Sequence, residues 1–288
     1  MIIVDGYCHL GECRVYDQRI TDGELVNALN ANRVSAAVVA PFPGAPNPAQ
    51  VHDDIASLAS RYPGRFFGLA NVNPHINRVT YHTEIERAIR QLGFVGIVLD
   101  TLGHAVDPNG QDGQTVFEAA REFAVPVIVH TGSGAPFGLP SVVLPRARSY
   151  SDVKIILAHA GGGLFASEAY VVAKEASNVY LETSSCSCED IKRLVEEIGP
   201  SRVMFGSDRP INQPVELLKY RSLNFYHYQQ YQALGQTAID VYRLVGVTEI
   251  PEEVPVPVES PATVESPATV ENSATVESSA TAESSATV

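Results

Sequence analysis

The chain has 288 residues, and its 33 acidic against 20 basic residues give a formal net charge of −13, which argues against nucleic-acid binding because that function usually needs a basic surface. No apolar run reaches the roughly 20 residues that span a bilayer, and four cysteines in a chain of this length do not make a disulfide scaffold. The first residues lack the basic start and cleavage site of a secretory signal, so we expect a cytoplasmic protein with reduced thiols.

Residues 1–250 alternate short β-branched runs with longer amphipathic stretches. The predicted strands are Ile2–Asp5, Ala36–Ala40, Phe67–Val72, Val95–Leu99, Val127–His130, Ile155–Ala158, Val179–Glu182 and Val203–Gly206. The predicted helices are Asp22–Asn32, Pro48–Tyr62, Tyr81–Leu92, Gln114–Phe123, Pro140–Ser149, Leu164–Ala176, Glu189–Ile198 and Val215–Arg221. This alternation predicts an α/β fold, a (β/α)8 TIM barrel. A doubly wound open sheet is the alternative, weakened because no GxGxxG follows the first strand.

The composition changes at residue 251. Residues 251–288 hold seven acidic residues, no Lys or Arg, and a six-residue repeat that begins as VESPAT. Scattered Val and Ala offer too little apolar surface to offset the entropy of ordering the chain. We therefore predict a TIM-barrel domain over residues 1–250 and a disordered low-complexity tail over residues 251–288.

Polar residues close several of the predicted strands. His9 follows the first strand, His130 and His159 end the fifth and sixth, and Asp208 follows the eighth. The carboxyl ends of the strands carry the active site in a barrel, and imidazole and carboxylate suit Zn²⁺ or Mn²⁺. A single histidine at a strand end is more often an ordinary hydrogen-bonded residue, but four such residues at one end predict a pocket.

Four segments carry a family resemblance: PVIVHTGSGAPFGLP, KIILAHAGGGLF, NVYLETSS and RVMFGSDRP. Together they resemble the amidohydrolase-related family of the amidohydrolase superfamily. This branch includes aminocarboxymuconate-semialdehyde decarboxylase and γ-resorcylate decarboxylase. The resemblance covers essentially all of residues 1–250 and implies a metal-dependent barrel hydrolase or decarboxylase.

The resemblance also implies roles for single residues. The family usually opens with a metal-binding His-x-His, of which His9 matches the second position while Tyr7 replaces the first. It implies His130 and Asp208 as further metal ligands, Asp208 as the group that takes a proton from the bound water, and His159 as a neighbour that polarises or protonates. Val98 and Asp100 stand where a lysine and a histidine are often found, which does not support a two-metal site with a carbamylated lysine.

Tyr7 leaves the metal site open to several interpretations. Residues 7 and 9 share one face of a strand, and Cys8 faces the other way. A Tyr7 phenolate could bind the metal, Cys8 or Glu182 could act as a fourth ligand, or His9, His130 and Asp208 could suffice with water. In the contrary interpretation, Tyr7 fills the place of the missing imidazole and no metal binds.

The main hypothesis is a hydrolase that cleaves a C–N or C–O bond of a small organic molecule. One divalent ion, Zn²⁺ before Mn²⁺, activates water, with Asp208 as general base. His159 stabilises the oxyanion, and Arg209 pairs with a substrate carboxylate or forms a salt bridge at the rim. The alternatives are a non-oxidative decarboxylase of a small carboxylic acid and a metal-free pseudoenzyme or binding protein. The sequence leaves open whether the chain forms a homo-oligomer. The expected partner is a small-molecule substrate, and no nucleic-acid or membrane partner is expected.

Overall fold

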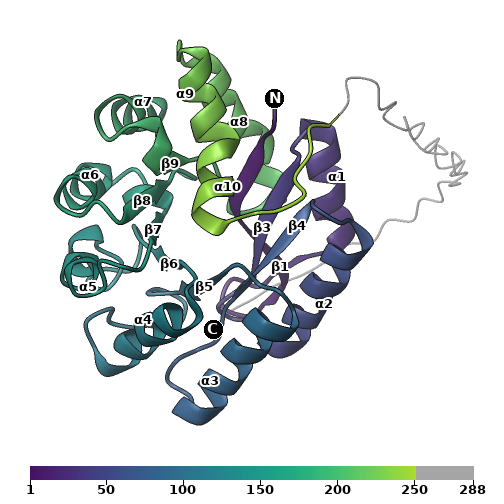
Figure 1. Ribbon diagram of the computed structural model, residues 1–288, viewed down its shortest axis with the longest axis vertical. Helices are drawn as coiled ribbons and strands as arrows, with labels where there is room; N and C mark the ends of the chain where they lie inside the picture. The colour runs from purple at the N-terminus through teal and green to yellow at the C-terminus, as the bar shows by residue number, and fades with distance from the viewer. Residues whose placement is uncertain (251–288) are drawn as a thin grey trace, which may run out of the picture. The chain divides into compact units, whose positions relative to one another are not determined.

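Short buried strands and the helices between them alternate along the chain in the computed structural model, which describes residues 1–250 (Figure 1). The strands are β1 (Val4–Cys13), β2 (Gln18–Ile20), β3 (Ala36–Pro41), β4 (Phe66–Ala70), β5 (Gly96–Leu99), β6 (Val127–His130), β7 (Ile155–Ala158), β8 (Val179–Glu182) and β9 (Val203–Met204). The α-helices of these residues are α1 (Asp22–Asn32), α2 (Pro48–Arg61), α3 (Arg78–Glu86), α4 (Gln111–Phe123), α5 (Leu144–Ser149), α6 (Ala166–Glu175), α7 (Cys188–Glu197), α8 (Gln213–Ser222), α9 (His227–Tyr231) and α10 (Thr237–Tyr242).

The strands form one sheet in the order β2-β1-β3-β4-β5-β6-β7-β8-β9. All neighbours are parallel except β2, which forms an antiparallel hairpin with β1. The backbone N–H of Gly6 donates to the carbonyl of Phe205 at 2.9 Å, and the N–H of Asp208 donates to the carbonyl of Tyr7 at 2.9 Å. These bonds join the last strand to the first and complete the predicted (β/α)8 TIM barrel.

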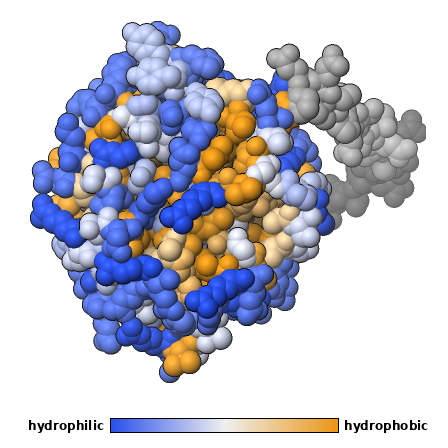
Figure 2. All heavy atoms as spheres, viewed as in Figure 1, coloured by the Kyte–Doolittle hydropathy of each residue, from blue (hydrophilic) through white to orange (hydrophobic). Residues whose placement is uncertain are grey.

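Buried apolar side chains form two layers, one inside the barrel and one between the strands and the helices. The inner layer includes Val4, Val38 and Ile156. The helix α10 covers the amino-terminal end of the barrel, where the Tyr242 hydroxyl donates to the carbonyl of Gly6 at 3.1 Å. Figure 2 shows apolar residues gathered on this face beside α10. The polar strand ends therefore lie at the opposite, carboxyl end.

The first predicted helix begins as its sequence indicates. Thr21 caps α1, and the side chains and backbones of Thr21 and Glu24 bond reciprocally in a capping box. Two other predicted helices are composite. A π-helical turn, Arg87–Gln91, continues α3, and a 3-10 turn, Pro140–Val143, precedes α5.

One difference from the predicted elements is at the first strand. It was expected to end at Asp5, whereas β1 runs to Cys13 because β2 pairs with its second half, as in Gly11 opposite Ile20. The register shifts between Asp5 and Cys8. The strand thus carries the first-strand site residues within itself rather than in a following loop.

None of the helices in residues 1–250 is long and apolar enough to cross a membrane. The predicted disordered tail lies outside the described residues, so the tail and the domain boundary at residue 250 stay predictions.

Candidate active site

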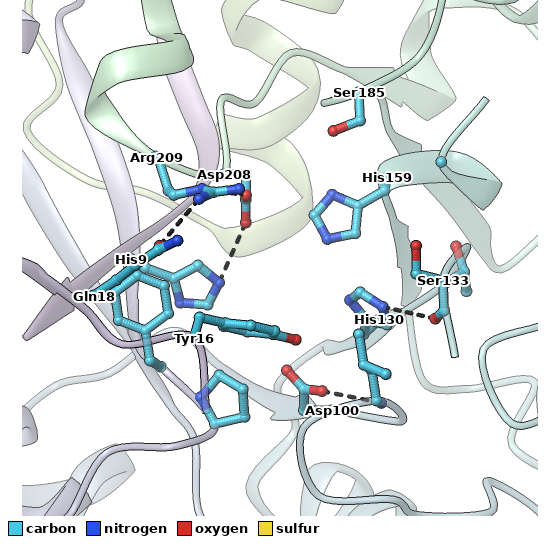
Figure 3. Close-up of a pocket in the computed structure, with 15 residues that line it drawn as sticks. His9, Tyr16, Gln18, Asp100, His130, Ser133, His159, Ser185, Asp208 and Arg209 are labelled. Carbon is cyan, nitrogen blue, oxygen red and sulfur yellow. Dashed lines mark hydrogen bonds and ion pairs between the residues drawn. The ribbon is translucent and has the colours of Figure 1, made fainter. Parts of the chain in front are cut away.

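A polar pocket of about 270 Å³ opens at the carboxyl ends of the strands (Figure 3). Its walls come from β1, β2, β6 and the segments that follow β3, β5, β7, β8 and β9. The lining residues are His9, Tyr16, Gln18, Phe42, Pro43, Asp100, Leu102, His130, Thr131, Ser133, His159, Gly162, Ser185, Asp208 and Arg209. The structure thus brings together His9, His130, His159, Asp208 and Arg209, whereas Tyr7, Cys8 and Glu182, the other residues considered as metal ligands, do not line the pocket.

Asp208 lies between a histidine and an arginine. Its Oδ1 is 3.5 Å from His9 Nε2, and its Oδ2 accepts a hydrogen bond from Arg209 Nε at 3.1 Å. Burial raises the pKa of Asp208, but the nearby His159, His9 and Arg209 outweigh burial and lower it below its ordinary value. Asp208 is therefore a carboxylate at neutral pH.

His9 is held in one orientation by its neighbours. Its ring stacks on Phe42, with centroids 4.5 Å apart and planes at 13°. Burial lowers the pKa of His9, although Asp208 opposes this. Its Nδ1 is buried and has no hydrogen-bond partner among the described residues. The ring thus presents Nε2 toward Asp208.

Tyr7 shares the inner face of β1 with His9 but does not line the pocket. Its side chain is 1% exposed, and its ring centroid is 4.8 Å from that of His9. Burial, reinforced by Asp100, Asp208 and Glu182, raises the pKa of Tyr7 well above its ordinary value. Tyr7 is therefore a neutral phenol packed in the barrel interior.

Cys8 faces the layer between strands and helices, as the alternation along the strand predicts. It therefore points away from the pocket.

His159 is anchored by the carboxyl group of Glu182, which is buried and does not line the pocket. His159 Nδ1 and Ser184 Oγ are 2.7 Å apart, and Ser184 Oγ donates to Glu182 Oε2 at 2.9 Å. Glu182 Oε2 also accepts the backbone N–H of His159 at 2.9 Å, and Oε1 accepts that of Ser184 at 2.7 Å. Glu182 therefore positions His159 rather than facing the pocket as a ligand.

The carboxyl group of Glu182 fits only because residue 206 is a glycine. A Cβ at Gly206 would lie 2.3 Å from Glu182 Oε1. The glycine of the GSD segment thus makes room for the group that holds His159.

His130 lies beside His159, with the ring centroids 5.0 Å apart at 70°. Its Nε2 is 3.2 Å from the carbonyl oxygen of Ser133. Burial and then the nearby His130 lower the pKa of His159 to about 4. His159 is therefore neutral at pH 7, and Figure 3 shows it facing the pocket across from His9.

Asp100, Tyr16 and Gln18 line the pocket, but the sequence interpretation assigned them no role. Asp100 Oδ1 accepts the backbone N–H groups of Leu102 and Gly103 at 3.1 and 2.6 Å. Its position directly after the predicted strand Val95–Leu99 could have identified Asp100 as a pocket residue. Tyr16 and Gln18 belong to the unpredicted β1–β2 hairpin and carried no such signal.

Several site residues have backbone conformations that non-glycine residues rarely adopt. His159, Ala160, Ser185 and Asp208 have φ values of 63°, 40°, 67° and 63°. Such conformations persist where surrounding contacts fix them and are common at functional sites. These backbone conformations set the directions of the side chains in the segments that follow β7, β8 and β9.

The donors present match the metal site that the resemblance implies only in part. His9 Nε2 and Asp208 Oδ1 are separated much as two ligands of one tetrahedral ion are, about 3.4 Å. However, residues 1–250 contain no group of three or more His, Cys, Asp and Glu side chains that could hold a metal ion. Tyr7 lies in the barrel interior, and Arg209 places a positive charge on the second oxygen of Asp208. The residues present thus supply two donors and do not fit a three-ligand site.

The fold and the site define the class of protein: a TIM barrel whose carboxyl-end pocket gathers histidines and aspartates from different strands. A family model described as amidohydrolase matches residues 24–244, and the chain belongs to this family. The predicted family is therefore confirmed. The reading of Tyr7 as the replaced first histidine stays a prediction.

Solved structures share the fold at low identity. A 5-carboxyvanillate decarboxylase from Novosphingobium aromaticivorans with manganese is 15% identical (TM-score 0.68), covering 84% of this chain and 96% of that one. A dihydroxybenzoic acid decarboxylase from a Polaromonas species, also with manganese, is 17% identical (TM-score 0.66; 84% and 97%). A probable 2-pyrone-4,6-dicarboxylic acid hydrolase from Acinetobacter baumannii is 16% identical (TM-score 0.63; 84% and 100%). Manganese in the two decarboxylases is consistent with a divalent ion in such sites.

Proposed function

We propose that the protein is a lyase that removes CO₂, without an oxidant, from a small carboxylic acid. Family membership and the fold shared with decarboxylases support this alternative over the hydrolase that led the sequence interpretation. The observation that carries it is the pocket itself. Two aspartates, Asp100 and Asp208, and three histidines surround about 270 Å³, with Arg209 beside them.

The charge of these walls suits decarboxylation better than hydrolysis. In decarboxylation, a proton adds to the carbon that carries the carboxylate, the C–C bond breaks, and CO₂ leaves as its electron pair returns to the substrate. The protonated substrate is electron-poor, and a carboxylate fixed beside it, as Asp208 is, stabilises the developing positive charge. Hydrolysis instead develops an oxyanion, which needs hydrogen-bond donors.

Three residues have separate roles in this proposal. Arg209 binds the substrate carboxylate, because its planar guanidinium matches two oxygens and its Nη2 makes no hydrogen bond within the described residues. Asp208 stays ionised and stabilises the protonated substrate. His159, neutral and facing the pocket, exchanges the proton with the substrate.

No step of the proposal passes through a metal ion, because the described donors do not fit a three-ligand site. The hypothesis from the sequence, in which Zn²⁺ before Mn²⁺ is held by His9, His130, Asp208 and Tyr7, is untested and is not part of the proposed function; the metal content of the natural chain tests it. A small molecule is the proposed partner.

The test is to incubate the full chain with a panel of small hydroxyaromatic and enol carboxylic acids and to measure CO₂ release. In D₂O, one deuterium should appear at the carbon that lost the carboxylate. Esters and lactones of similar size form the comparison panel. Hydrolysis of that panel with no CO₂ release from any acid would contradict the proposal and restore the hydrolase hypothesis.

A further inference from the structure

A buried chain of three polar groups runs from the pocket into the protein. It begins at the His159 ring, passes through the Ser184 hydroxyl and ends at the Glu182 carboxyl, with links of 2.7 and 2.9 Å. Ser184 and Glu182 are completely buried, and His159 is 8% exposed. The other end of the chain is thus closed, and protons enter or leave it only through the His159 face in the pocket.

The chain has two proton arrangements that use the same atoms. When Glu182 is ionised, Ser184 donates to Glu182 and accepts from the protonated Nδ1 of His159, which leaves Nε2 as an acceptor toward the pocket. When Glu182 is protonated, Glu182 donates to Ser184, Ser184 donates to Nδ1, and Nε2 carries the proton. Both states contain a neutral imidazole.

We propose that Glu182, Ser184 and His159 form a proton relay in which Glu182 stores the proton that His159 delivers to the pocket. Glu182 gives its proton to Ser184 Oγ, Ser184 gives its own to Nδ1, and Nε2–H passes to the substrate carbon. Glu182 is left as a carboxylate, and water entering the empty pocket returns one proton through Nε2. His159 changes tautomer and never carries a charge.

The surroundings of Glu182 suit a group that holds a proton. Among residues 1–250 no lysine or arginine pairs with it. The titratable groups near it from other elements are Asp5, Tyr7 and Cys8 on β1, Cys186 after β8, Tyr220 on α8 and Tyr242 on α10, besides His159. Burial raises the pKa of Glu182 to about 8, although the hydrogen bonds from His159 and Ser184 oppose this. No neighbour that is charged at neutral pH favours the ionised form.

As a proton source for CO₂ release the relay rests on the proposed function, but its existence does not. Its test therefore needs no substrate. The full chain is labelled with ¹⁵N-histidine, His159 is assigned by comparison with His159→Gln, and its tautomer is followed by NMR from about pH 6 to about pH 10. We expect Nε2–H below the transition and Nδ1–H above it, with the ring neutral throughout.

Two variants test the connection. Ser184→Ala removes the middle link and should abolish the tautomer change, while Ser133→Ala, which removes a pocket hydroxyl that does not bond His159, should retain it. Glu182→Gln cannot ionise and should lock one tautomer, which keeps the test valid if Ser184→Ala fails to fold. A single tautomer at every pH in the natural chain, or a change that persists in Ser184→Ala, would overturn the relay. A relay without CO₂ release from the acid panel would instead remove only the proposed decarboxylation.

Discussion

His9 Nε2 lies 3.5 Å from Asp208 Oδ1, so the first strand of the barrel and the segment after the last strand meet at one carboxylate. The other oxygen of Asp208 accepts from Arg209. Asp208 is thus held by an imidazole on one side and a guanidinium on the other. Together with the nearby His159, these two groups outweigh the effect of burial and keep the carboxylate of Asp208 ionised.

Tyr7 stands where the family resemblance implies a metal-binding histidine, and this leads to a first prediction, for Tyr7→His. The new side chain would share the face of β1 with His9 and supply a third donor to the pair formed by His9 and Asp208. We expect the natural chain to retain less than about 0.1 Zn²⁺ after dialysis and Tyr7→His to retain about one per chain. Metal content is measured by mass spectrometry on protein purified without a His-tag.

Tyr7→Phe is the matched control, because it removes the hydroxyl without adding a nitrogen, and it should gain no metal. One tightly held ion in the natural chain, lost in His130→Ala, would contradict the two-donor interpretation and restore the predicted ligand set. Mn²⁺ is tested in parallel with Zn²⁺.

Arg209 gives a second prediction, for substrate affinity. Arg209→Met removes the charge-assisted bonds to a substrate carboxylate, each of which contributes about 1.5–3 kcal/mol. We expect kcat/KM for CO₂ release to fall by about 10- to 100-fold, mostly through KM. Arg14→Met, on an exposed arginine that pairs only with Glu12 among the described residues, should leave both constants unchanged. An unchanged KM in Arg209→Met would assign Arg209 to the salt bridge at the rim instead.

How far the sequence predicts the site depends on where each residue lies. His130 ends one continuously apolar strand and His159 directly follows another, so their meeting at one end of the barrel followed from the fold alone. Tyr16 and Gln18 could not be predicted, because β2 is only three residues long and is stabilised by pairing with β1 rather than by its own pattern.

The role of Glu182 could not be predicted for a different reason. Its place at the end of β8 indicated a pocket residue or a ligand. Its orientation is set by contacts distant in sequence, with His159 and with the space left by Gly206. Such contacts depend on the packed tertiary structure and leave no periodic signal in the chain.

A third prediction concerns stability at low pH. Burial raises the pKa of Glu84, but hydrogen bonds from His52 and Arg87 outweigh it and lower the pKa from 4.5 to about 2. The folded state therefore favours the ionised form, so its stabilising contribution is complete above about pH 4.5 and is lost as the pH falls toward 2. Glu84→Gln should lower Tm at pH 7.

The difference in Tm between Glu84→Gln and the natural chain should shrink as the pH is lowered from about 5 to about 3. Thermal unfolding followed by circular dichroism measures it. Glu86→Gln, which removes a more exposed carboxylate paired with Arg90, should change Tm little at any pH. A difference that stays constant with pH would mean that Glu84 contributes through packing rather than charge.

The last prediction concerns the glycine beside the buried carboxyl. In Gly206→Ala the new Cβ would meet Glu182 Oε1 at 2.3 Å, so either the carboxyl or the backbone after β9 has to move. Overpacking of this kind costs about 1–3 kcal/mol, which lowers Tm by about 3–10 °C in a domain of this size. Displacement of Glu182 should also release Ser184 from its bond and leave His159 without a fixed tautomer.

Gly23→Ala is the control, because Gly23 lies in α1 with only Thr21 Oγ1 at 4.0 Å, and alanine there should raise stability slightly. An unchanged Tm and an unchanged His159 tautomer in Gly206→Ala would show that the carboxyl group does not depend on the space that Gly206 leaves.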